Sequence, residues 1–118
     1  MTENSSSEII IKLTINSWRF AKLFKKVIEN QDAGKKDRYS NQINYFFKTL
    51  EESLNEIGMN IVNLEGKIYE AGMAVIPLNI EDFNPEAELL IDEMLEPVIM
   101  NEDGVFKNGT VILREVKR

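Results

Sequence analysis

The segment Gly58–Val116, GMNIVNLEGKIYEAGMAVIPLNIEDFNPEAELLIDEMLEPVIMNEDGVFKNGTVILREV, decides the fold of this chain. Within it, short apolar runs rich in Val and Ile alternate with Gly, Pro, Asn and Asp, a pattern typical of short strands joined by turns. We predict strands at residues 59–64, 73–78, 90–91, 98–100 and 110–116. Residues 58–118 are therefore expected to form a small, mostly antiparallel β domain.

Four features predict how these strands are connected. Asn108-Gly109 predicts a two-residue type I′ hairpin, in which both residues have positive φ, and Asn101–Gly104 predicts a turn. Asn84-Pro85 predicts the start of a short helix, with Asn as its cap and Pro in its first turn. Pro77 lacks a backbone N–H, so it marks an edge strand or a bulge.

The residues before Gly58 are predicted to be helical. Residues 1–7 are polar and Ser-rich and are expected to be disordered. A first helix is expected at residues 8–30 and a second at 40–57, separated by a polar loop at 31–38 that contains Gly34. The two helices form either an antiparallel hairpin or, if the loop is helical, one long stalk. The predicted fold class is thus α+β, with a helical hairpin or stalk at 8–57 and the β domain at 58–118.

The first predicted helix carries two apolar stripes on nearly opposite sides. The first stripe comprises Ile9, Leu13, Phe20, Leu23, Phe24 and Val27, and the second comprises Ile11, Ile15 and Trp18. We expect the first stripe to face the core of the chain. The second is either covered by a helix or the β domain of the same chain, or it docks on another subunit, because exposed apolar stripes mark interfaces. Ile11, Ile15 and Trp18 are therefore the candidate self-association residues, and a homodimer is one expected state.

Length and composition narrow the class of protein. The chain has 118 residues, 43% of them hydrophobic, which suffices for one small core. No run approaches the roughly 20 apolar residues of a membrane span, and the first seven residues lack the basic region of a signal peptide. The absence of cysteine fits a reducing compartment. We expect a cytoplasmic protein without a membrane partner.

The net charge of −6 is unevenly distributed. Between Glu65 and Asp103, eleven acidic residues face Lys67 alone, a balance of −10, whereas residues 8–29 carry +3. Binding to a phosphate backbone needs clustered Lys and Arg. An acidic β domain therefore argues against a nucleic-acid partner, and the basic helix is interpreted as a solvated face.

The sequence contains no complete catalytic motif. Without His or Cys, it has neither Ser–His nor Cys–His pairs nor the usual zinc ligands. The acid-rich segment 81–96 lacks the alternating spacing and central Gly of a calcium loop, and no Gly-rich phosphate loop occurs. We expect no catalytic residue, no metal site and no cofactor, so the protein is not predicted to be an enzyme.

Two segments of the β domain resemble those of a known family. Gly66–Ala71, GKIYEA, follows a helix that ends at Gly58, and Gly104–Arg114, GVFKNGTVILR, closes the domain. The chain from Leu54 onward resembles the GrpE family, nucleotide exchange factors of DnaK-type heat-shock chaperones. That family has a turn of the type Gly-x-x-Phe-Asp-Pro before a compact β domain, and a last hairpin of the type Gly-Tyr-x-x-Asn-Gly-Arg. Its long N-terminal dimer helix is much shorter here.

The resemblance implies a co-chaperone whose β domain presses on a DnaK-type ATPase and favours release of ADP. It places the candidate partner-binding residues near the end of the chain: Met100, Phe106, Asn108 and Arg114. Met100 and Phe106 offer apolar anchors, Asn108 a hydrogen-bonding group, and Arg114 a guanidinium for an acidic partner. The alternative is a non-catalytic interaction subunit of an unrelated cytoplasmic complex.

Overall fold

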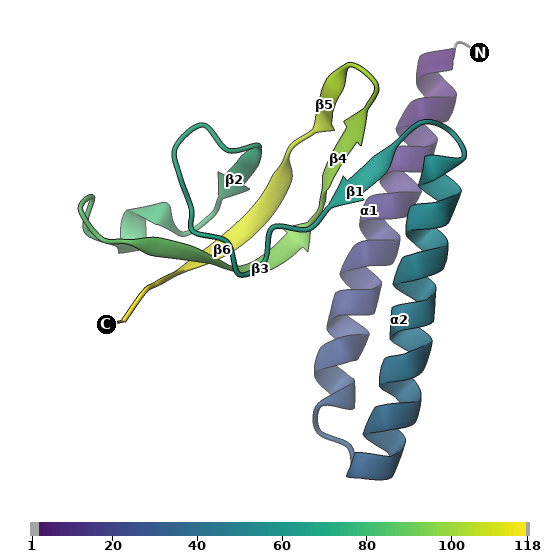
Figure 1. Cartoon of the computed structure of the whole chain (residues 1–118), viewed down its shortest axis with the longest axis horizontal. Helices are drawn as coiled ribbons and strands as arrows, with labels where there is room; N and C mark the ends of the chain where they lie inside the picture. Colours follow the sequence, from purple (N-terminus) through teal and green to yellow (C-terminus); the bar gives the residue numbers. More distant parts are fainter. Residues whose placement is uncertain (1–2, 118) are drawn as a thin grey trace. The chain divides into compact units, whose positions relative to one another are not determined.

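The computed structural model describes residues 3–117, and the chain divides into two compact units, residues 1–57 and 58–118. The first unit is a pair of long helices and the second contains six short strands in two sheets (Figure 1). The α+β fold class is therefore confirmed. The division falls between Ile57 and Gly58, the position at which the sequence pattern changes from helical to strand-like.

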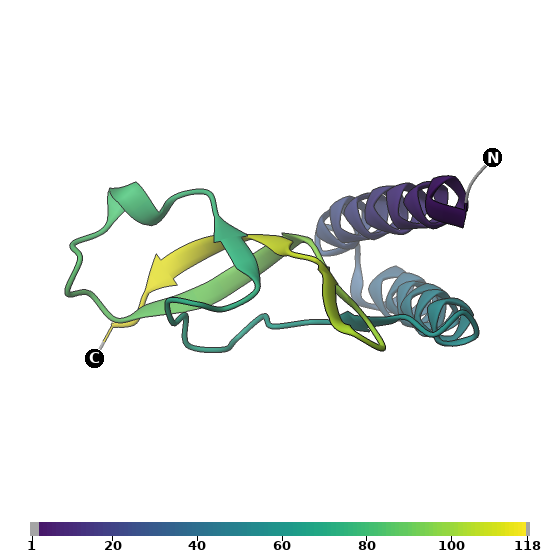
Figure 2. The same cartoon turned by 90° about the horizontal axis from the view of Figure 1, so that it is seen from above.

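The helical unit consists of α1, Glu3–Ile28, and α2, Ala33–Asn55. The two helices run side by side as an antiparallel hairpin (Figures 1 and 2), so they do not form one stalk. The predicted loop at 31–38 was wrong, because α2 already begins at Ala33. The side chain of Asp32 accepts a hydrogen bond from the Lys35 backbone N–H at 3.0 Å. This cap satisfies a free donor of the first turn and starts α2 before residue 40.

The start of α1 also differs from the prediction. α1 begins at Glu3, so residues 3–7, which were expected to be disordered, belong to the helix. Residues 1–2, the rest of that predicted segment, lie outside the described residues.

The face of α1 that packs on α2 contains Trp18. Its ring meets the Phe47 ring edge-on, with centroids 5.0 Å apart, and Trp18 is only 3% exposed. Ile11 and Ile15 lie on the same face and are also buried. Of the two alternatives that the sequence left open for this stripe, coverage within the chain is therefore the one observed. Ile11, Ile15 and Trp18 do not offer a free surface.

The opposite face of α1 is apolar and exposed. Five of its side chains are between 50% and 70% exposed, and we call them the α1 stripe: Ile9, Leu13, Phe20, Leu23 and Val27. The prediction that these residues face the core was wrong. Only Phe24 of the predicted core stripe packs inward, with its ring centroid 6.2 Å from that of Tyr39.

The β unit consists of two three-stranded sheets. The first has the order β1-β4-β5 and is antiparallel; the second has the order β2-β6-β3, with β2 parallel and β3 antiparallel to β6. The strands are β1 Asn60–Val62, β2 Val75–Pro77, β3 Leu89–Glu96, β4 Val98–Asn101, β5 Gly104–Lys107 and β6 Gly109–Glu115. Strands β3, β4, β5 and β6 follow one another along the chain with short connections (Figures 1 and 2). Because β3 and β6 belong to one sheet and β4 and β5 to the other, this part of the chain contributes strands to both sheets. Pro77 lies in an edge strand, where its missing N–H is harmless.

Two predicted connections of the β unit were wrong. Asn108-Gly109 is not a type I′ hairpin, because neither residue has positive φ and β5 pairs with β4 instead of β6. The tight hairpin is the one between β4 and β5, where Gly104 has a φ of 123°. After Asn84 there is a turn and no helix, since the Asn84 side chain accepts the Glu86 N–H at 2.9 Å. The short helix comes earlier, as the 3-10 helix η1, Ile80–Asp82.

Candidate partner-binding groove

A hollow of about 760 Å³ opens on the surface of the β unit, and we call it the groove. Its volume is within the usual range of about 300–1,000 Å³ for binding pockets. Three stretches of chain surround it: the segment before β2, η1 with the turn after it, and the start of β3. The lining residues are Tyr69, Ala71, Ile80, Glu81, Phe83, Asn84, Pro85, Ala87, Glu88 and Leu89.

The wall that carries Tyr69 is held against β3 by backbone hydrogen bonds. The Tyr69 N–H donates to the Leu89 carbonyl at 2.9 Å, and the Gly66 N–H donates to the Ile91 carbonyl at 2.8 Å. Ile91 in turn donates to the Lys67 carbonyl at 2.9 Å. Residues 66–69 therefore follow β3 like a short extra strand, and the position of Tyr69 is set by the sheet.

The wall formed by η1 is held by a side-chain amide. Asn79 donates through Nδ2 to the Leu113 carbonyl at 2.9 Å and accepts the Leu113 N–H at 2.8 Å. Leu78 adds a backbone hydrogen bond to the Val111 carbonyl at 3.0 Å. These three bonds attach the segment before η1 to β6, so the groove is bounded on both sides by segments tied to one sheet.

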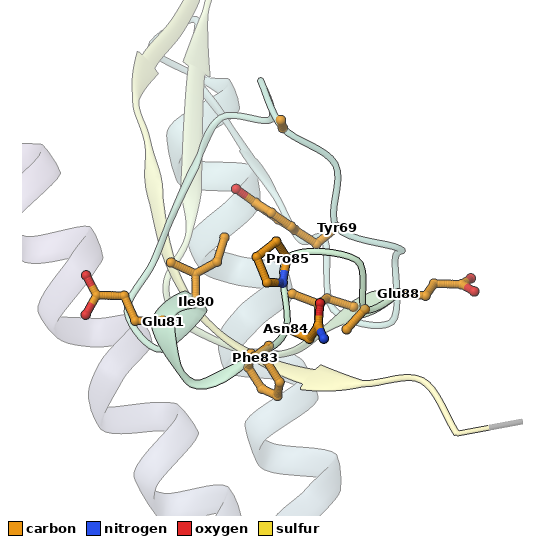
Figure 3. Close-up of a pocket in the computed structure, with 10 residues that line it drawn as sticks. Tyr69, Ile80, Glu81, Phe83, Asn84, Pro85 and Glu88 are labelled. Carbon is orange, nitrogen blue, oxygen red and sulfur yellow. The ribbon is translucent and has the colours of Figure 1, made fainter.

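The centre of the groove is apolar and its margins are acidic. Figure 3 shows Ile80 and Pro85 lying between Tyr69 and Phe83, with the carboxylates of Glu81 and Glu88 directed away on opposite sides. Because these two carboxylates do not converge on one point, they are not arranged as an acid–base pair. The arrangement suits binding of an apolar group that carries positive charge beside it.

The partner-binding residues predicted from the resemblance lie on both sheets. Met100, on β4, is half-buried, whereas Phe106, on β5, is 42% exposed. Asn108 is exposed in the link between the two sheets. Arg114, on β6, is exposed and its Nε donates to Asp92 Oδ1 at 3.1 Å. Met100 and Phe106 thus share a sheet, and Arg114 belongs to the other.

Comparison of the chain with protein-family models, with curated proteins and with solved structures finds no match. Within the described part of the chain, no helix is long and apolar enough to cross a membrane. Among the described residues, no group of three or more acidic side chains is placed to hold a metal ion.

Sequence reasoning missed most of the groove. Tyr69 was noted only within Gly66–Ala71, the segment that resembles the turn of the GrpE family, and Asn84-Pro85 was interpreted as a helix start. Ile80 and Phe83 stand singly among acidic residues, without helical or strand periodicity. An isolated apolar pair in an acidic, non-periodic segment was the available signal.

Proposed function

We propose that this chain is a GrpE-like, non-catalytic co-chaperone that promotes release of ADP from a DnaK-type ATPase in the cytoplasm. The observation that carries the proposal is the resemblance of Gly66–Ala71 and Gly104–Arg114 to the turn and the last hairpin of that family. The fold class supports it, since a helical unit followed by a compact β domain is what the resemblance implies. The second segment forms β5, its link and β6, which lie in different sheets and do not form the hairpin that the resemblance implies.

The proposed mechanism is differential binding. A factor that binds the open state of an ATPase better than its closed state shifts the population towards the open state, from which ADP leaves. Tenfold acceleration requires a preference of about 1.4 kcal/mol for the open state. Phe106 and Asn108 are exposed and suited to direct contact, and Met100 is half-buried on β4, in the same sheet as Phe106. Arg114 is exposed enough to exchange Asp92 for an acidic partner.

Stopped-flow release of a fluorescent ADP analogue from the DnaK-type ATPase of the same organism tests this function. We expect a saturable acceleration of about tenfold or more. Phe106→Ala should reduce it, whereas Val105→Ala, a neighbouring residue that is 48% exposed, serves as the matched control. Absence of acceleration at saturating concentration would contradict the exchange function and favour the alternative, a non-catalytic interaction subunit of another cytoplasmic complex.

We also propose that the protein is a homodimer that pairs through the α1 stripe. The stripe residues and Asn16 are spaced alternately by four and three positions, which is the 3.5-residue period of a helix seam. Five large side chains exposed by half or more amount to roughly 500 Å². Two copies would bury on the order of 1,000 Å², which is near the lower limit for a specific interface.

The charges beside the α1 stripe favour parallel pairing. Lys12, Arg19 and Lys26 each directly precede a stripe residue and lie on the same flank of the seam. In a parallel pair, this flank faces the uncharged positions Ile10, Ser17 and Phe24 of the other copy. In an antiparallel pair, the cations of the two copies would face each other, which is unfavourable. Sedimentation velocity tests the dimer.

A further inference from the structure

We propose that the groove binds a protein segment that carries Arg or Lys next to an apolar side chain. The groove lies entirely within the β unit, and the proposal concerns its own chemistry. It goes beyond the exchange function, because it does not depend on which protein supplies the segment or on whether that protein hydrolyses ATP.

The groove exists before any partner binds. Tyr69 is fixed to β3 through its backbone, and Asn79 fixes the η1 segment to β6 with two hydrogen bonds. The turn beyond η1 is closed by the Ala87 N–H, which donates to the Asn84 carbonyl at 2.9 Å. A site with its walls already ordered loses little conformational entropy on binding, so even a short segment can bind measurably.

Charge complementarity identifies the occupant as cationic. The lining includes the acidic residues Glu81 and Glu88 and no Lys or Arg. The surrounding sequence from Glu65 to Asp103 has a balance of −10, with Lys67 as its only basic residue. Such a field raises the local concentration of cations and repels phosphate and carboxylate ligands.

The two aromatic rings add a second reason for a cation. Tyr69 and Phe83 are half-buried on different stretches of the lining (Figure 3), and each ring face attracts an ammonium or guanidinium group. The aliphatic stem of Arg or Lys can lie on Ile80 and Pro85 while its charged head stays near the acidic margins. A hydrophilic polyamine would satisfy only the charges, so the apolar lining favours a peptide with mixed character.

Titration of the full chain, followed by two-dimensional amide NMR, tests the proposal. The probe is the capped peptide Leu-Arg-Phe-Arg-Leu, compared with the same peptide carrying citrulline or Glu in place of Arg. We expect saturable shifts at the amides of Tyr69, Phe83 and Ala87 with the Arg peptide. Citrulline keeps the shape and removes the charge, so its peptide should bind about fivefold to tenfold more weakly, and the Glu peptide should not saturate.

A charge-reversal variant with a matched control tests whether the Arg peptide binds at the groove. Glu81→Lys changes an exposed groove residue and should weaken binding of the Arg peptide by about fivefold. Glu51→Lys makes the same change on the exposed surface of α2 and should bind like the wild type. Equal affinity of the Arg and citrulline peptides, shifts confined to the helical unit, or an unchanged affinity of Glu81→Lys would each overturn the proposal. Failure of ADP release with intact peptide binding would refute only the exchange function.

Discussion

At the scale of single residues, Gly109 is required for close packing and not, as the sequence predicted, for a turn. It has no positive φ and lies in β6. A Cβ atom added to it would lie 2.7 Å from the Met94 Cε atom and 2.9 Å from the Glu96 carbonyl oxygen. Since real Cβ atoms do not approach other atoms so closely, Gly109 is needed for the close packing of β3 against β6.

We predict that Gly109→Ala lowers the free energy of unfolding by about 1–3 kcal/mol, because the added methyl group overpacks the contact with β3. Chemical denaturation measures the change. Gly34→Ala is the matched control, since its Cβ would meet only Asp32 Oδ1 at 3.7 Å. That variant should keep its stability or gain up to about 1 kcal/mol. Equal stability of the two variants would contradict this account of Gly109.

At the scale of elements, α1 has two apolar faces with different roles. Trp18 is 3% exposed and packs on Phe47, whereas Phe20, two positions later, is 70% exposed. Side chains two positions apart lie on different sides of a helix. The two residues therefore allow a direct test of which face of α1 packs on α2.

We predict that Trp18→Ala destabilises the protein by about 3–5 kcal/mol, because it leaves a cavity between the helices. Phe20→Ala should change the unfolding free energy by less than about 0.5 kcal/mol when measured at a concentration where the chain is monomeric. Thermal unfolding followed by circular dichroism distinguishes the two. A larger loss in Phe20→Ala than in Trp18→Ala would show that the assignment of the two faces is reversed.

At the scale of the whole molecule, the α1 stripe predicts self-association. Wild-type protein should sediment as a dimer at high concentration, and Leu13→Glu and Phe20→Glu should each shift it towards the monomer, because a carboxylate in the seam loses its water on pairing. Tyr45→Glu, on α2, is the control, since Tyr45 is 72% exposed and lies outside the stripe.

The melting temperature gives a second measure of the same state. In a dimer, unfolding is coupled to dissociation, so the melting temperature should rise with protein concentration in the wild type and in Tyr45→Glu. It should be independent of concentration in Phe20→Glu. A wild type that sediments as a monomer at every concentration would refute the dimer.

The groove and the α1 stripe have opposite chemistry, although both are exposed apolar surfaces. The α1 stripe is flanked by Lys12, Arg19 and Lys26, and the groove by Glu81 and Glu88. Because flanking charges govern the choice of partner more than affinity does, the two surfaces should not compete for one ligand. The two surfaces thus differ in the sign of the charges beside them.

The sequence alone determined the order of the two units and the charge of this protein. The change from a helical period to short Val- and Ile-rich runs at Gly58 fixes a helical unit before a β unit, because local periodicity reports which element buries one side. It also limited Pro77 to an edge strand or a bulge, of which the structure has the edge strand, and it showed that the β unit is acidic. Periodicity, however, records only that a face is apolar.

Only the tertiary structure decided which partner each apolar face meets. In the folded chain, Trp18 and not Phe20 packs on α2, and β6 pairs with β2 and β3 instead of β5. The tertiary structure also brought Tyr69 and Phe83 to one groove across a separation in sequence that no local pattern records. The physical reason is that pairing and packing between distant segments depend on competing contacts of similar chemistry, and these are resolved only when the whole chain folds.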